Sequence, residues 1–140
     1  MREPSEFPRF SDSEMAARHA SVRALMEQDN LDAVLVYGAG RFASEVYWLT
    51  DWPGGREAYV LLQRDGDPVL SMQLYNHVPM ARVLSVVKDV RWAGANTANG
   101  AVELLGERAL ESKRIGLVGS ILSSITKRCA RNLPRLNSST

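Results

Sequence analysis

The feature of the sequence that most constrains the fold is an apolar run, LDAVLVY at 31–37, which ends at Gly38. The run is rich in β-branched residues and apolar at almost every position, a pattern typical of a strand buried on both faces. Such strands occur inside sheets that carry helices on either side. The run therefore predicts a central strand of an α/β sheet.

Helices and further short strands are predicted to alternate along the rest of the chain. Helical spacing of apolar residues predicts helices over 12–28, 76–87, 99–110 and 121–133. Short apolar runs predict strands over 59–63, 68–72, 90–93 and 115–118. Asp65-Gly66 separates the first two of these runs, which is a strong signal for an antiparallel hairpin. The sequence thus predicts a single α/β domain with a mixed, mostly parallel sheet, one antiparallel hairpin and flanking helices.

Composition excludes several classes of protein. The 140 residues are 45% hydrophobic and 24% charged, close to the average of globular domains. Lys and Arg number 17 against 16 Asp and Glu, so no broad basic surface is available for nucleic acid or an anionic membrane. The one cysteine, Cys129, permits neither an intrachain disulfide nor a cysteine-based zinc site. No signal peptide or membrane-spanning run is evident, so we expect a soluble, cytoplasmic protein.

One segment has the spacing of a nucleotide-binding motif. Gly38 to Ala43 reads G-x-G-x-x-A directly after a predicted strand, with Glu57 at the distance of a ribose ligand. The motif requires a helix and then a parallel strand, whereas a Trp-Pro-Gly-Gly segment and a hairpin follow here. We therefore interpret the glycines as a turn, and a small nucleotide-binding domain is the least favoured alternative.

Catalytic motifs are scarce. His19 and His77 form no metal-binding pair, and no nucleophile elbow of the type G-x-S-x-G is present. The strongest candidate for a binding surface is an aromatic cluster, Phe42 to Trp52, in a loop bounded by glycines. A loop packed by its own side chains is the equal alternative.

Five motifs in order carry a resemblance to a known family. They are LDAVLV at 31–36, VYWLTDW at 46–52, AYVLL at 58–62, DGDPVL at 65–70 and RIGLVG at 114–119. Together they resemble the N-terminal domain of the creatinase, prolidase and aminopeptidase P family. The resemblance implies a ribonuclease H-like fold over 11–134, with an extended lead-in at 1–10 and a disordered tail at 135–140.

The resemblance also implies a function for the larger protein. In peptidases of this family a C-terminal pita-bread domain holds two divalent metal ions, such as manganese, and carries the chemistry. The sequence does not contain that domain, so we expect a domain, or a truncated product, of a metal-dependent Xaa-Pro peptidase or a creatinase-like hydrolase. The chain by itself is expected to be inactive and to hold no metal.

By resemblance, the N-terminal domain helps to form a homodimer, and its loops reach the active site of the partner subunit. The matching positions here are Tyr47, Leu49, Thr50 and Trp52, with Arg56 and His77 as further candidates. Asp51 stands where the family has a small residue. The expected partners are a second copy and the chain's own catalytic domain. A stand-alone protein-interaction module of the same fold is the alternative function.

Overall fold

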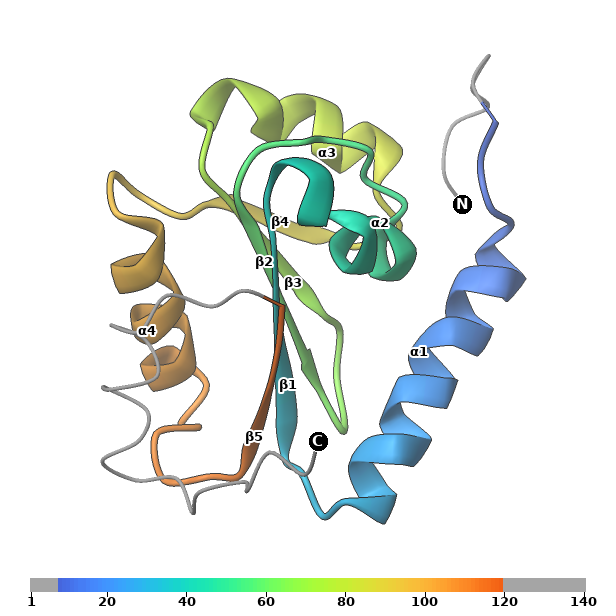
Figure 1. Cartoon of the computed structure of the whole chain (residues 1–140), viewed down its shortest axis with the longest axis vertical. Helices are drawn as coiled ribbons and strands as arrows, with labels where there is room; N and C mark the ends of the chain where they lie inside the picture. Colours follow the sequence, from blue (N-terminus) through green and yellow to red (C-terminus); the bar gives the residue numbers. More distant parts are fainter. Residues whose placement is uncertain (1–7, 120–140) are drawn as a thin grey trace.

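The computed structural model describes residues 8–119, which form a sheet with helices on both faces (Figure 1). The helices are α1 (Asp12–Gln28), α2 (Ser44–Thr50), α3 (Val78–Leu84) and α4 (Thr97–Glu107), with 3-10 turns at Gly40–Phe42 and Tyr75–His77. The strands are β1 (Ala33–Gly38), β2 (Ala58–Gln63), β3 (Val69–Met72), β4 (Asp89–Trp92) and β5 (Ile115–Val118).

The strands of the described sheet lie in the order β4-β3-β2-β1-β5. Strand β2 runs antiparallel to both of its neighbours, β1 and β3, whereas β4 is parallel to β3 and β5 is parallel to β1. Four of the five strands therefore point the same way, and β2 alone is reversed. This confirms the predicted mixed, mostly parallel sheet and its hairpin, in which Gly66 has a φ of 91° that favours glycine.

The glycines after β1 form a turn. Gly40 has a φ of 56° and opens a 3-10 turn, after which α2 leads into the reversed strand β2. The β1–α2–β2 unit is therefore antiparallel and lacks the second parallel strand that the dinucleotide motif requires. This confirms the interpretation of Gly38 to Ala43 as a turn.

Two predicted helices, those over 76–87 and 99–110, differ from the structure in their bounds; the second is observed as α4, over Thr97–Glu107. Helix α1 has the predicted bounds; the Ser11 hydroxyl caps it by accepting a hydrogen bond from the Glu14 amide, and the Glu14 carboxylate binds Arg18. The helix predicted over 76–87 is shorter at both ends. It stops at Leu84 because Ser85 is extended and its hydroxyl donates to the Thr50 carbonyl. The helix predicted over 121–133 lies outside the described residues.

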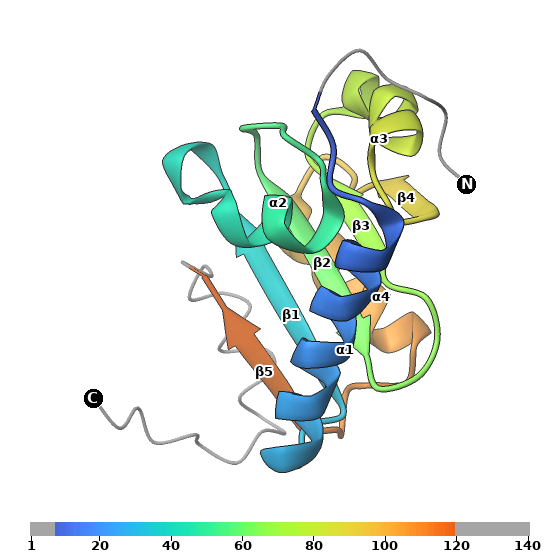
Figure 2. The ribbon, with the colours of Figure 1, turned by 90° about the vertical axis from the view of Figure 1, so that its right-hand side faces the viewer.

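In Figure 2 helix α1 lies in front of the sheet and α4 behind it. The core has one layer of side chains on each of these faces. Helices α1, α2 and α3 pack over the face that includes Val34, Val36 and Val60. Helix α4 packs over the opposite face, which includes Leu35, Tyr37 and Tyr59. Alternate residues of β1 thus contribute to both layers, as expected for a strand buried on both sides. No helix within residues 8–119 is both long and apolar enough to cross a membrane.

Candidate functional site

Most of the predicted site residues lie in or next to the connection between α2 and β2, residues 51–57, which we call the 51–57 loop. Because β2 is antiparallel to β1, the start of β2 lies beside the end of β1, with Ala58 paired to Gly38. The loop therefore lies at the rim of the sheet where β1 ends. The Gly40 amide donates to the Gly55 carbonyl at 2.6 Å and ties the loop to the glycine turn.

The start of the loop is fixed from within the core. The buried Thr50 hydroxyl donates to the Val46 carbonyl at 2.7 Å and accepts from the Trp52 amide at 3.0 Å. The Thr50 carbonyl accepts from the hydroxyl of Ser85 at 3.0 Å. Leu49 is also buried. The buried side chains of Leu49 and Thr50 thus belong to the core that supports the start of the loop.

The structure brings two of the predicted residues together. The rings of Trp52 and His77 meet edge to face with their centroids 5.8 Å apart. Trp52 is buried, and a Cβ on Gly54 would lie only 2.3 Å from its indole nitrogen. The glycine is therefore required for the chain to pass over the indole. Arg56, by contrast, is exposed near the far end of the loop.

Tyr47 lies beside a pocket of about 330 Å³. Its lining residues are Pro8, Arg9, Tyr47, Asp51, Pro53 and Leu84. The walls are mostly apolar, and the pocket is of a size that can take a small apolar side chain. Arg9 and Leu84 were not predicted as pocket residues, because nothing in the sequence of the lead-in indicates that it packs against α3. The Arg9 guanidinium donates to the Val83 carbonyl at 2.8 Å, which fixes the lead-in there.

A polar cluster lies at the same rim, between β1, β2 and α4. The Thr97 hydroxyl donates to the Glu57 carboxylate. Burial, followed by the negative charge of Glu57, raises the pKa of both Tyr37 and Tyr59. Sequence reasoning considered Glu57 only as a ribose ligand, whereas the structure pairs it with the first residue of α4.

The described residues do not fit a metal centre. Within 8–119, no three His, Cys, Asp or Glu side chains lie where they could share an ion. The Nε2 of His19 forms a hydrogen bond with the Leu49 carbonyl, 2.7 Å away, and this bond connects α1 to α2. His77 contacts Trp52.

An apolar groove lies on the face that carries α1 and α2, beside β5. We call it the β5 groove; its volume is about 380 Å³. Its apolar lining consists of Val22, Val34, Val36, Trp48, Leu49 and Val118. Trp48 and Val118 are 41% and 39% exposed, respectively, so this hydrophobic surface is open to solvent. Hydrophobic surface of this kind is typical of a place where another segment of protein binds.

Comparisons with known proteins agree on one family. The family model described as the Creatinase/Prolidase N-terminal domain matches residues 18–137. No curated protein matches the chain significantly.

Solved structures share the fold at low sequence identity. A structure of an Xaa-Pro aminopeptidase from Streptococcus pyogenes aligns with a TM-score of 0.67 and 18% identity, covering 87% of each chain. The N-terminal domain of the cytoplasmic peptidase PepQ from Mycobacterium tuberculosis H37Rv aligns with a TM-score of 0.65 and 19% identity, covering 85% of this chain and 92% of that one. The prolidase from Pyrococcus horikoshii OT3 has a TM-score of 0.62 and 15% identity; 86% of this chain covers 33% of that one.

Proposed function

We propose a function from the finding that the chain belongs to the Creatinase/Prolidase N-terminal domain family. It acts as the non-catalytic N-terminal domain of an Xaa-Pro peptidase-like or creatinase-like hydrolase. The family match over residues 18–137 carries this proposal. The chemistry belongs to a following catalytic domain, which holds two divalent metal ions such as manganese. A cytoplasmic location is part of the proposal, since a structurally similar domain comes from a peptidase called cytoplasmic.

Within that function, the domain contributes to a homodimer, and the 51–57 loop shapes access to the active site of the partner subunit. What supports this role is the construction of the loop. The hydrogen bond from the Ser85 hydroxyl to the Thr50 carbonyl fixes the start of the loop. Within the loop, the indole of Trp52 packs edge to face against the ring of His77. The guanidinium of Arg56 is left exposed on a backbone that is fixed on both sides. A fixed loop with an exposed polar group is typical of recognition elements on rigid scaffolds.

The proposal is tested by hydrolysis and by mass in solution. The purified 140-residue chain is incubated with Mn²⁺ and alanyl-proline, with the prolidase from Pyrococcus horikoshii as the active control in the same buffer. We expect no cleavage by the chain and a sedimenting species of about twice 15.5 kDa. Sustained cleavage by the chain would overturn the non-catalytic role, and a monomer at every concentration would overturn the dimer.

The β5 groove favours a second candidate function, a stand-alone protein-interaction module of the same fold. Its open apolar lining, which includes Trp48 and Val118, gives a surface that another protein can bury. The two functions differ in what the natural polypeptide contains. A native product much heavier than 15.5 kDa favours the hydrolase domain, and one of that mass favours the interaction module.

A further inference from the structure

Glu57 is the last residue of the 51–57 loop and directly precedes β2. Its carbonyl accepts a hydrogen bond from the Gln73 amide at 2.9 Å, just beyond the end of β3. Its neighbour in the chain, Arg56, is exposed and is one of the residues assigned above to substrate access. The contacts that fix the position of Glu57 therefore also restrict the position of the Arg56 backbone, from which the exposed side chain extends.

The side chain of Glu57 contacts a different element, α4. Its Oε1 accepts from the hydroxyl of Thr97, the first residue of that helix, and Thr97 is buried. A carboxylate near a helix N-terminus is stabilised by the free amides and the helix dipole at that end. The Asn96 side chain caps the same turn by accepting from the Asn99 amide at 3.1 Å. Glu57 thus joins the end of the loop to the first turn of α4, a helix 40 positions further along the sequence.

Two tyrosines lie beneath this contact. Tyr37 on β1 and Tyr59 on β2 have ring centroids 4.9 Å apart, and Tyr59 is fully buried. The Tyr59 hydroxyl has no hydrogen-bond partner within the described part of the chain, although Thr97 and the Glu57 carboxylate lie beside it. A buried hydroxyl without a partner costs free energy, so an acceptor close by is favoured. An ionised carboxylate offers about four acceptor sites, and Thr97 uses one of those on Glu57.

We propose that Glu57 is the positioning residue of the 51–57 loop: its carboxylate clamps the end of the loop to Thr97 of α4. The position of α4 and the position of Arg56 are thereby coupled. A movement of α4 shifts the exposed guanidinium, and a ligand that holds the guanidinium steadies the first turn of α4. The functional meaning of this coupling rests on the proposed role of the loop, but the coupling itself does not.

Amide hydrogen exchange of the whole chain, read residue by residue by NMR, tests the clamp. In Glu57→Gln the amides of Gly54 to Arg56 and those of the first turn of α4 should exchange about fivefold faster, because the Thr97 hydroxyl then donates to a neutral amide oxygen and the hydrogen bond is weaker. Thr97→Val, which keeps the shape but lacks the hydroxyl, should produce the same two changes. The double variant should show little more than either single variant, because both remove one contact.

Two control variants make the result decisive. Glu103→Gln removes a carboxylate from the exposed face of the same helix and should change neither segment. Thr97→Ser keeps the hydroxyl and should restore the slow exchange of the loop. Faster exchange of α4 alone would mean a helix cap without coupling and would overturn the proposal, as would a uniform rise across the sheet. Because exchange is measured without substrate, a failed dimer or hydrolysis test leaves this result unaffected.

Discussion

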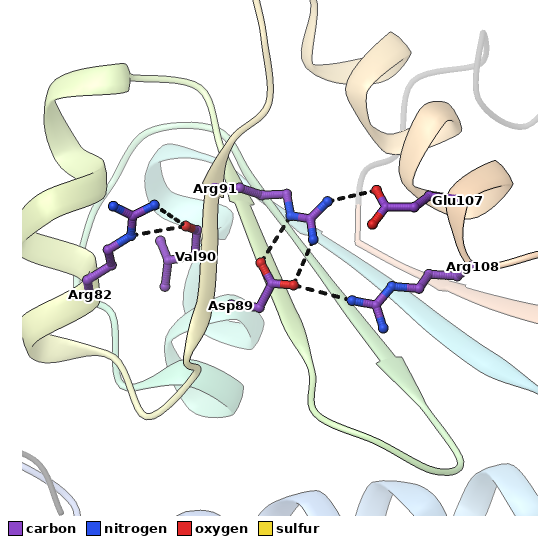
Figure 3. A network of polar contacts seen from close by, with 6 residues as sticks. All are labelled: Arg82, Asp89, Val90, Arg91, Glu107 and Arg108. Carbon is purple, nitrogen blue, oxygen red and sulfur yellow. Dashed lines mark hydrogen bonds and ion pairs between the residues drawn. The ribbon is translucent and has the colours of Figure 1, made fainter.

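Along the β4 edge of the described sheet, charged side chains cover the outermost strand, whereas beside β5 the surface is hollow and apolar. At the β4 edge, the Asp89 carboxylate accepts from Arg91 at 3.0 and 2.7 Å and from Arg108 at 3.2 Å, and Arg91 also binds Glu107 (Figure 3). The Arg82 guanidinium donates twice to the Val90 carbonyl, at 3.3 and 3.1 Å.

The difference shows which edge is protected against pairing with another strand. A strand at the edge of a sheet exposes carbonyls and amides that a further chain can pair with, and charged side chains that occupy them prevent this. Arg82 occupies the Val90 carbonyl in this way. Beside β5, Val118 and Trp48 are partly exposed and line the β5 groove. Within the described residues, the β4 edge is therefore the protected one, whereas the surface beside β5 leaves apolar side chains open to solvent.

The largest expected effect is on the stability of the domain, from a substitution in the charged network at the β4 edge. Asp89→Ala removes the shared acceptor of Arg91 and Arg108 and leaves two guanidinium groups close together. We expect the free energy of unfolding to fall by about 1–2 kcal/mol in urea titrations, an amount limited by partial exposure to solvent. The matched control, Asp67→Ala, removes an exposed carboxylate from the hairpin. Equal losses in the two variants would show that the network at the β4 edge does not stabilise the domain.

The same network predicts a pH dependence. The hydrogen bonds from Arg91, partly opposed by burial, and the charges of Arg91 and Arg108 hold the pKa of Asp89 below its ordinary value of 3.8. The charged form is thus favoured in the folded state. The stabilisation is present above pH 3.8 and is lost as the pH falls below it. Wild type should lose up to about 1 kcal/mol more than Asp89→Asn on acidification. Parallel pH profiles of the two proteins would contradict this.

The smallest effect in free energy, but the most direct comparison of the edges, is on self-association. Val118→Lys places a charge at the rim of the β5 groove and should shift sedimentation toward the monomer. Arg82→Gln frees the Val90 carbonyl and should increase association, whereas the control Lys88→Gln removes a charge nearby without freeing a carbonyl. Association that responds to Arg82→Gln but not to Val118→Lys would reverse the assignment of the two edges.

Local patterns were sufficient to predict much of the fold. The run at 31–37 gave a strand buried on both faces, and Asp65-Gly66 gave the hairpin, because both signals depend on neighbouring residues. The end of α3 was predicted wrongly, since Ser85 leaves the helix to donate to Thr50, 35 positions earlier. A contact of that kind depends on packing and leaves no periodic signal in the sequence.

The candidate site was less accessible to prediction for the same reason. Motif spacing placed Leu49 and Thr50 beside Trp52, but it could not tell which side chains face the core, and the structure buries both. The contact of Glu57 with Thr97 and the packing of Arg9 near Leu84 join distant segments. The roles of Tyr47, Leu49, Thr50, Trp52, Arg56 and His77 in substrate access remain predictions.

The reversed direction of β2 also decides where the molecule tolerates change. Since β2 begins at the rim that carries the 51–57 loop, it ends at the opposite rim, where Gln63 pairs with the first residue of β1. The hairpin tip at Asp65-Gly66 is exposed there, a full strand length away from the loop. Exposed turns of this type accept inserted sequence most readily. A fluorescent label or an affinity tag placed in this turn therefore leaves the opposite rim, with the 51–57 loop, unaltered.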